Sequence, residues 1–216
     1  MLREISLFQD LPEDQLDFLI SITHQFTYPK GSILLTQGEL SNSLFVVLEG
    51  RLKVFATAQD GRQTLLAFLG PGDFVGELSL LDDGPHASTV QTVEDTRTML
   101  VTQDVFHRFV DTYPENLLPM LRILAARLRA LDETICSLST LDVYGRVARV
   151  LLQEAQDLES DGLMRVPRMT HQDIAEMVGS SREMVSRIMK DLRQGGYIRL
   201  DSKKRILLQK KLPSRW

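Results

Sequence analysis

The segment 180–190, SSREMVSRIMK, holds the side chains with the most specific chemistry in the chain. On a helix, Arg182, Glu183, Ser186 and Arg187 would lie on one face near its N-terminal end. Arginine can donate two hydrogen bonds to O6 and N7 of guanine, and glutamate can accept one from N4 of cytosine. These donors and acceptors predict a surface that reads base edges in the major groove of DNA. The alternative is that Glu183 only completes a helix cap and that the arginines only contact phosphate.

Four further polar residues suit contacts to phosphate, which position a protein on DNA without specifying sequence; they are Thr170, Gln172, Ser181 and Lys190. Both sets require two short helices joined by a tight turn. Two helix starts are indicated by an N-cap residue followed three positions later by an acidic residue. These capping boxes are Thr170 with Asp173, and Ser180 with Glu183.

Gly179 lies between the two expected helices, where a turn needs a residue that readily adopts positive φ. Ala175 is small enough for the point where the helices cross, and their shared core is expected from Ile174, Val178, Val185 and Ile188. Beyond the glycine pair 195–196, the runs Tyr197–Leu200 and Arg205–Leu208 predict a hairpin. The sequence therefore predicts a winged helix-turn-helix.

The net charge of −4 hides an asymmetry along the chain. Residues 1–113 carry 7 Lys+Arg against 16 Asp+Glu, residues 114–167 carry 6 against 8, and residues 168–216 carry 12 against 5. A basic module suits a polyanion, because phosphate neutralisation and counterion release supply most non-specific DNA affinity. Double-stranded DNA is the partner that this charge favours, although a solvated basic face would give the same count.

Residues 28–102 consist of short apolar runs separated by turn signals rich in glycine. The strand-length runs are Ser32–Leu35, Leu44–Leu48, Leu52–Ala56, Thr64–Leu69 and Met99–Val101. A helix is expected before them at Pro12–Ile20. Because no βαβ alternation is present, the pattern predicts an antiparallel β-roll or jelly roll over residues 1–113.

The periodicity changes after Pro114, where apolar residues repeat at alternate spacings of four and three: Leu117, Leu121, Leu124, Leu128, Leu131, Ile135 and Leu138. Such a heptad seam favours a helix that pairs with a copy of itself; the alternative is a helix packed on its own β-domain. We expect a dimerisation helix and hinge over residues 114–141. The DNA-binding domain is expected over residues 142–216, with Asp142 as N-cap of a helix at Val143–Ala155. The fold class is α+β.

Several classes of protein are disfavoured by composition. No run approaches the roughly 18 apolar residues of a membrane span, and the N-terminus lacks the layout of a signal peptide, so we expect a cytoplasmic protein with no membrane partner. Cys136 is the only cysteine, which excludes an intrachain disulfide. The four histidines are scattered, so the metal site of a cupin-like enzyme is not predicted, nor is any catalytic residue.

The ordered set of features resembles the Crp-Fnr family of bacterial transcription regulators over essentially the whole chain. The matching motifs are Gly76-Glu77-Leu78 in the roll, Leu141-Asp142-Val143 and Gly145-Arg146 at the hinge, and Ser181-Arg182-Glu183 with Val185 and Arg187. The resemblance implies a homodimer on a palindrome of TGTGA-like or TTGAT-like half-sites, acting on RNA polymerase as activator or repressor. Arg182 matches the cyclic-AMP receptor branch and Ser186 matches the Fnr branch. The identity of the outer bases of the half-site is therefore not determined.

The resemblance also implies an effector pocket, from which this chain departs at two places. Cyclic-nucleotide-binding members carry an Arg-Ser pair about ten residues after Gly-Glu-Leu, where this chain has His86 in place of the arginine. A neutral imidazole does not replace a permanent bidentate cation. The Thr-Ser pair that contacts adenine aligns with Leu131-Asp132. We therefore expect an effector other than cyclic AMP, or none; the candidate pocket residues are Gly76, Glu77, Leu78, His86, Ala87, Ser88, Leu131 and Asp132.

Other effectors stay as alternatives beside cyclic AMP. An iron–sulfur sensor is disfavoured because the N-terminal cysteine set of the Fnr branch is absent. Haem would have to use His24, His86, His107 or Cys136 as axial ligand. A cyclic dinucleotide brings two phosphates, for which the central roll offers only Arg51, Lys53, Arg62 and Arg97. A regulatory subunit that binds a ligand but no DNA is a further alternative, which the basic winged module opposes.

Overall fold

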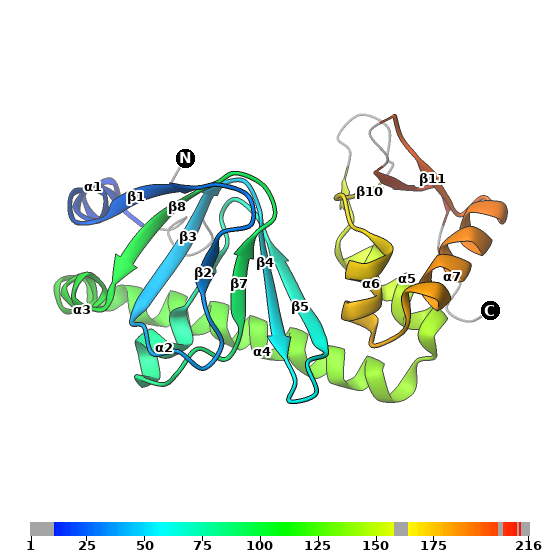
Figure 1. Ribbon diagram of the computed structural model, residues 1–216. Coiled ribbons are helices and arrows are strands. Elements are labelled where there is room, and N and C mark those ends of the chain that lie inside the picture. Colours follow the sequence, from blue (N-terminus) through cyan, green and yellow to red (C-terminus); the bar gives the residue numbers. More distant parts are fainter. Residues whose placement is uncertain (1–10, 158–163, 203–204, 211, 213–216) are drawn as a thin grey trace. The chain divides into compact units, whose positions relative to one another are not determined.

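The computed structural model describes residues 11–157, 164–202, 205–210 and 212 of the 216-residue chain. The chain divides into two compact units, Met1–Arg129 and Ala130–Trp216 (Figure 1). The first is built on antiparallel sheets and the second mainly on helices, which confirms the predicted α+β class. None of the helices in the described ranges combines the length and apolar character that a bilayer crossing requires.

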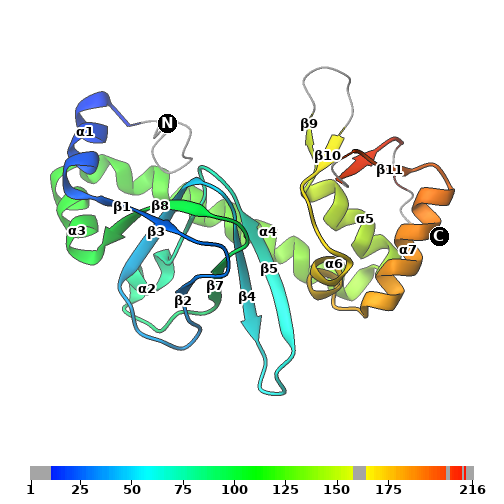
Figure 2. The same ribbon diagram turned by 45° about the horizontal axis from the view of Figure 1, so that its top comes forward.

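Two antiparallel four-stranded sheets form the roll of the first unit (Figure 2). One has the order β1 (His24–Tyr28), β8 (Thr96–Thr102), β3 (Ser43–Glu49) and β6 (Phe74–Val75). The other has the order β2 (Ile33–Leu35), β7 (Thr89–Thr92), β4 (Leu52–Thr57) and β5 (Gln63–Leu69). All five predicted strand-length runs lie on strands of these sheets, and β1, β6 and β7 complete them.

Helices cover the roll of the first unit at several points. The predicted N-terminal helix is α1 (Glu13–Ile22), and α2 (Glu77–Asp82) follows β6. After β8 come α3 (Gln103–Thr112), a short 3-10 helix η2 (Pro114–Asn116) and the long α4 (Leu117–Thr140). Helices α1 and α3 lie at the same end of the roll, where the rings of Phe18 and Tyr113 pack edge-on with centroids 5.6 Å apart (Figure 1).

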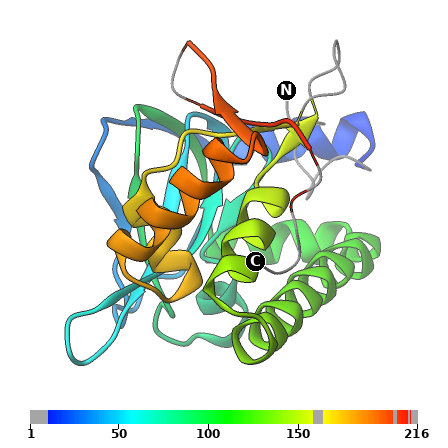
Figure 3. The ribbon, with the colours of Figure 1, turned by 90° about the vertical axis from the view of Figure 1, so that its right-hand side faces the viewer.

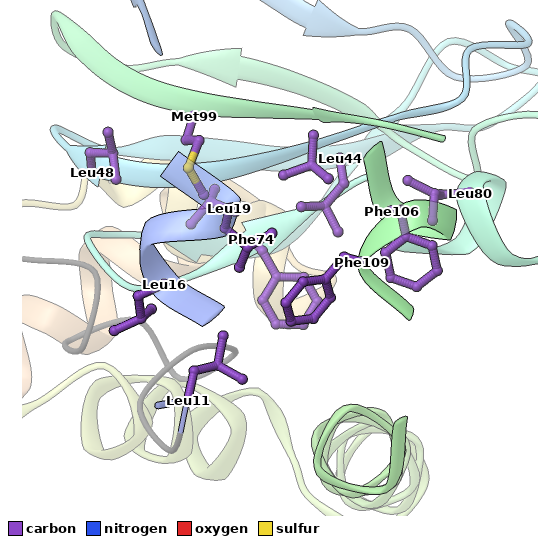
Figure 4. Close-up of a cluster of buried hydrophobic side chains, with 12 residues drawn as sticks. Leu11, Leu16, Leu19, Leu44, Leu48, Phe74, Leu80, Met99, Phe106 and Phe109 are labelled. Carbon is purple, nitrogen blue, oxygen red and sulfur yellow. The ribbon is translucent and has the colours of Figure 1, made fainter. Parts of the chain in front are cut away.

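Strand β3 is buried on both faces and separates two apolar clusters. Leu44, Val46 and Leu48 belong to a cluster between the sheet and the helices (Figure 4), with residues of α1 and α3 that include Leu16, Leu19, Phe106 and Phe109. Phe45 and Val47 belong to the second cluster, between the two sheets. Because side chains alternate along a strand, one apolar run supplies both clusters. This burial explains why residues 44–48 read as an uninterrupted apolar segment.

The described part of the second unit contains the C-terminal part of α4, three further helices and a small sheet (Figure 3). Helix α5 (Val143–Gln153) begins at the predicted N-cap, since the Asp142 side chain accepts from the Gly145 N–H at 2.7 Å. Then come β9 (Gln156–Asp157), β10 (Met164–Val166), α6 (His171–Val178) and α7 (Arg182–Gln194). The predicted hairpin is present as β11 (Ile198–Leu200) paired with β12 (Ile206–Leu208). Residues 203–204 of its connection lie outside the described part.

Candidate nucleic-acid interface and effector pocket

A tight turn joins α6 and α7 and sets the position of the base-reading candidates. Gly179 has a φ of 63°, the left-handed conformation predicted for the turn. The predicted core is also present: Ile174, Ala175, Val178, Val185 and Ile188 are all buried. Arg146 of α5 holds the end of α6, because its Nε donates to the Val178 carbonyl at 2.8 Å. The turn is therefore fixed by backbone conformation, packing and one arginine.

The two helix starts differ in their caps. Thr170 and Asp173 form the predicted capping box at the start of α6. The second predicted box, Ser180 with Glu183, is wrong. Ser181 is the N-cap of α7, and its hydroxyl accepts from the Met184 N–H at 3.2 Å, while the Ser180 N–H donates to the Ala175 carbonyl at the end of α6. Glu183 is thus not part of a capping box, so that reason for treating it as structural is removed.

The N-terminal half of α7 carries the predicted base-reading residues on its surface (Figure 3, where α7 is orange). Arg182, Glu183 and Arg187 are exposed, and Ser186 is half-buried. Nδ1 of His171, the first residue of α6, lies 2.9 Å from Oγ of Ser186. Sequence reasoning missed His171, because a contact between two helices leaves no local signal.

Three of the four residues predicted to contact phosphate already form hydrogen bonds within the protein. The Thr170 hydroxyl donates to Asp173 at 2.7 Å and accepts from the Asp173 N–H at 3.1 Å. The Gln172 side chain donates to Glu176 at 2.9 Å, and Ser181 serves as the N-cap described above. Lys190 is exposed on α7. Of the four, Lys190 is therefore the one best placed to offer a charge to a phosphate.

The Gly76-Glu77-Leu78 motif lies at the start of α2, in the first unit. Gly76 has a φ of 95°, and a Cβ there would lie 2.2 Å from the Ser43 carbonyl oxygen, so only glycine fits. The Glu77 carboxylate accepts from Nη1 of Arg127 at 2.7 Å, although the Glu77 side chain is only 14% exposed. Leu78 is exposed.

Arg127 was not among the predicted pocket residues, yet it makes most of the contacts there. Besides Glu77, its guanidinium donates to the Phe74 carbonyl at 2.8 Å and lies over the Phe74 ring, 3.9 Å from the centroid. An arginine on a heptad helix gives no indication that it reaches a roll residue 50 positions earlier. The buried carboxylate therefore already has a cation supplied by α4 of the same chain.

His86 takes the place expected for the phosphate-binding arginine, and it is buried. Its Nδ1 lies 2.8 Å from Oγ of the buried Ser79, while Nε2 has no hydrogen-bond partner among the described residues. Burial lowers the pKa of His86 below its usual 6.5, and the nearby Glu39 carboxylate partly opposes this shift. A neutral imidazole is thus favoured at this position. The neighbouring Ala87 is exposed and Ser88 half-buried.

Two comparisons bear on the family. A model described as the cyclic nucleotide-binding domain matches residues 25–113, and one described as the Crp-like helix-turn-helix domain matches residues 145–212. The CRP-like cAMP-activated global transcriptional regulator of Mycobacterium tuberculosis is 34% identical over 206 residues, which cover 94% of this chain and 92% of that protein. The chain belongs to the Crp-Fnr family.

Other relatives of this Crp-Fnr chain agree. The cyclic AMP receptor protein of Thermus thermophilus is 33% identical over 194 residues, covering 90% of this chain and 88% of that protein. The solved structure of the c-di-GMP responsive regulator CLP of Xanthomonas campestris has a TM-score of 0.77 at 23% identity, and the match covers 92% of this chain and all of that one. The first result supports membership of the family, and the second shows the fold. The M. tuberculosis relative is by name a transcriptional regulator, and neither it nor the T. thermophilus relative is by name an enzyme.

The heptad residues of this Crp-Fnr protein form an uncovered apolar stripe in the single chain. Six of the seven predicted interface residues are exposed: Leu117, Leu121, Leu128, Leu131, Ile135 and Leu138, with exposed fractions of 40% to 64%. Leu124 is half-buried and lines a cavity of about 50 Å³ together with Leu44 and Phe74. The alternative of a helix packed on its own β-domain holds for another part of α4, since Met120 and Ile123 pack against the cluster of the first unit. Leu131 and Asp132, also predicted for the pocket, belong to the second unit and are exposed.

The candidate haem ligands differ in their exposure. His24, His107 and Cys136 are exposed, and His86 is buried against Ser79. Within the described ranges, no group of three or more His, Cys, Asp or Glu side chains could hold a metal ion. Of the cations predicted as candidates for a cyclic dinucleotide, Arg51 and Lys53 lie over the rings of Phe68 and Phe55. Arg62 pairs with Asp60, and Arg97 pairs with Glu49.

Proposed function

We propose that this Crp-Fnr protein binds, as a homodimer, a palindromic site of TGTGA-like or TTGAT-like half-sites in promoter DNA. In this proposal it acts in the bacterial cytoplasm on RNA polymerase, with an effector other than cyclic AMP. Residues 1–113 form the effector domain, 114–141 the dimerisation helix and hinge, and 142–216 the DNA-binding domain. The observation that carries the proposal is the exposure of Arg182, Glu183 and Arg187 on the second helix of a helix-turn-helix.

Base reading is assigned to the N-terminal half of α7. Arg182 and Arg187 can each donate two hydrogen bonds to a guanine edge, and Glu183 can accept from cytosine N4. The support for Glu183 as a reader is that Ser181, and not a Ser180–Glu183 box, caps α7. Ser186 lies on the same stretch and contributes a hydroxyl. Thr170, Gln172, Ser181 and Lys190 are proposed to contact phosphate, with Lys190 supplying the charge.

The homodimer is proposed to form through the apolar stripe of α4. A two-fold axis would bring the same leucines of two copies together and cover them. It would also present two α7 helices to major-groove segments about 34–36 Å apart, one helical turn of DNA. A palindromic target follows from that symmetry.

The effector proposal rests on His86. By the family resemblance, this position would need a cation to bind the phosphate of a cyclic nucleotide. His86 is buried and its pKa is lowered, so it offers no permanent charge. The M. tuberculosis and T. thermophilus relatives are cyclic-AMP proteins by name, but this chain has His86 where the family resemblance implies an arginine. Calorimetry with cyclic AMP tests the proposal: sub-micromolar binding would overturn it.

The DNA proposal is tested with labelled duplexes at physiological salt. A duplex with two inverted half-sites of either type should bind about a thousand-fold more tightly than a scrambled duplex. Glu183→Ala should relax the preference at one inner base pair. Asp191→Ala, which removes the same charge from the C-terminal half of α7, should leave that preference intact. Equal affinity of the wild-type protein for both duplexes would refute specific reading.

A further inference from the structure

The contact between His171 and Ser186 joins the start of α6 to the base-reading stretch of α7. Nδ1 of His171 and Oγ of Ser186 are 2.9 Å apart, and the residues are separated by 15 positions in sequence. Ser186 lies between Glu183 and Arg187 on the proposed reading face, while His171 is exposed on α6. A side chain of the first helix thus controls the hydroxyl of a proposed base reader in the second.

The chemistry of a serine–imidazole pair decides what the hydroxyl can offer to DNA. A serine hydroxyl has one proton to donate and two lone pairs, and a neutral imidazole has one donor nitrogen and one acceptor nitrogen. If Nδ1 is the acceptor, Ser186 must donate its only hydroxyl proton to His171. Its oxygen can then only accept a hydrogen bond from a base. If Nδ1 carries the proton, the Ser186 proton is free to be donated to a base.

We propose that His171 is a specificity-determining positioning residue that makes Ser186 an acceptor. The inference rests on the DNA-binding function proposed above. The first helix of a helix-turn-helix crosses the DNA backbone, which brings the start of α6 to a phosphate. A phosphate beside Nε2 accepts the proton of that nitrogen, and in the tautomer with its single proton on Nε2 the ring accepts from Ser186 at Nδ1. The Ser186 oxygen then selects an exocyclic amino group, N6 of adenine or N4 of cytosine.

Two substitutions separate the roles of the two imidazole nitrogens. In His171→Asn, the side-chain amide reaches the place of Nδ1 and can still accept from Ser186, but it no longer reaches the phosphate. In His171→Gln, the longer amide reaches the place of Nε2 and keeps the phosphate contact, but it no longer holds Ser186. A merely structural role for His171 would lower affinity for every DNA sequence alike in both variants.

The experiment selects sites from a randomised palindromic duplex library with the full-length protein. Ser186→Ala identifies the base pair whose preference it changes most. Four duplexes that differ only at this base pair are then titrated with each variant. The wild-type protein should discriminate among the four base pairs there by about tenfold. His171→Gln should reduce this preference to roughly twofold with total affinity retained, whereas His171→Asn should keep the preference and lose about fivefold in affinity on all four duplexes.

The outcomes separate this inference from the proposed function. A His171→Gln protein with the wild-type preference would overturn the inference and leave specific binding intact. A wild-type protein that selects no sequence at all would instead refute the proposed function. The double variant Ser186→Ala, His171→Gln should show no loss of preference beyond that of Ser186→Ala alone.

Discussion

Replacing Leu128 with glutamate should convert the proposed dimer into monomers. Leu128 is 61% exposed in the single chain. Full burial of a leucine contributes about 1.5–3 kcal/mol, so covering the exposed part contributes roughly 1–2 kcal/mol in each chain. Two-fold symmetry counts this twice, giving about 2–4 kcal/mol, or roughly a 30-fold to 1,000-fold change in the dissociation constant of the dimer. Two carboxylates placed in an apolar seam weaken it further, because each must lose its water.

Sedimentation equilibrium at several protein concentrations measures this dissociation constant directly. The matched control is Ala126→Glu, which adds the same charge to an exposed position of α4. Residue 126 lies two positions from Leu128, which is about 200° around the helix and away from the stripe. The control should stay dimeric. Equal dissociation constants for Leu128→Glu, Ala126→Glu and the wild-type protein would show that the stripe is not the interface.

Three further predictions concern the first unit. Gly76→Ala should lower the free energy of unfolding by at least about 2 kcal/mol more than Gly38→Ala in urea titrations, because only at Gly76 would the new Cβ collide with backbone; both positions have positive φ. The lowered pKa of His86 means that the unfolded chain takes up its proton first as pH falls. The stability from its neutral form is complete above about pH 6.5 and is lost as pH falls toward the folded pKa, so His86→Asn should show a smaller loss between pH 7.5 and 5.5; an equal loss would refute this role. Arg127→Ala should lower the free energy of unfolding by about 1–3 kcal/mol, since it leaves a buried carboxylate unpaired, and adding Glu77→Gln should restore part of it; no restoration would exclude the ion pair as the cause.

Local signals predicted most of the helix-turn-helix. The Thr170–Asp173 box, the positive φ of Gly179 and the buried positions are all properties of short stretches of chain. The cap of α7 was misplaced by one residue because Ser180 and Ser181 are chemically equal candidates. The backbone decides between them: Ser181 has the extended φ and ψ of −83° and 151°, and the Ser180 N–H closes α6 by bonding to Ala175.

The strands that the sequence did not indicate share a physical reason. Strand β6 has only two residues, and the β1 residues His24–Tyr28 are mostly exposed, so neither produces an apolar run. Strand β7, Thr89–Thr92, has the sequence TVQT and contains one apolar residue, the buried Val90. These segments become strands because longer apolar strands beside them offer backbone partners. Tertiary pairing, and not local propensity, determines them.

The surroundings of the candidate effector-pocket residue Glu77 depend on a contact between residues that are distant in the sequence. The sequence predicted His86 in place of a cation, and in the structure this histidine is buried and its pKa is lowered by burial. It gave no indication that Arg127 lies on Glu77, because the partners are 50 positions apart and one of them belongs to the heptad helix. A pocket described from motif residues alone would thus miss its only cation contact with Glu77 among the described residues.

The position of Arg127 next to Leu128 gives the pocket a direct connection to the proposed interface. An anionic ligand that used Arg127 would have to compete with Glu77 and with the Phe74 carbonyl. Loss of those bonds would loosen α4 from the roll at the residue adjacent to an interface leucine. Measuring the dimer dissociation constant in the presence of an anionic ligand tests this connection: an anion that binds Arg127 should shift the constant, and Arg127→Ala should abolish that shift.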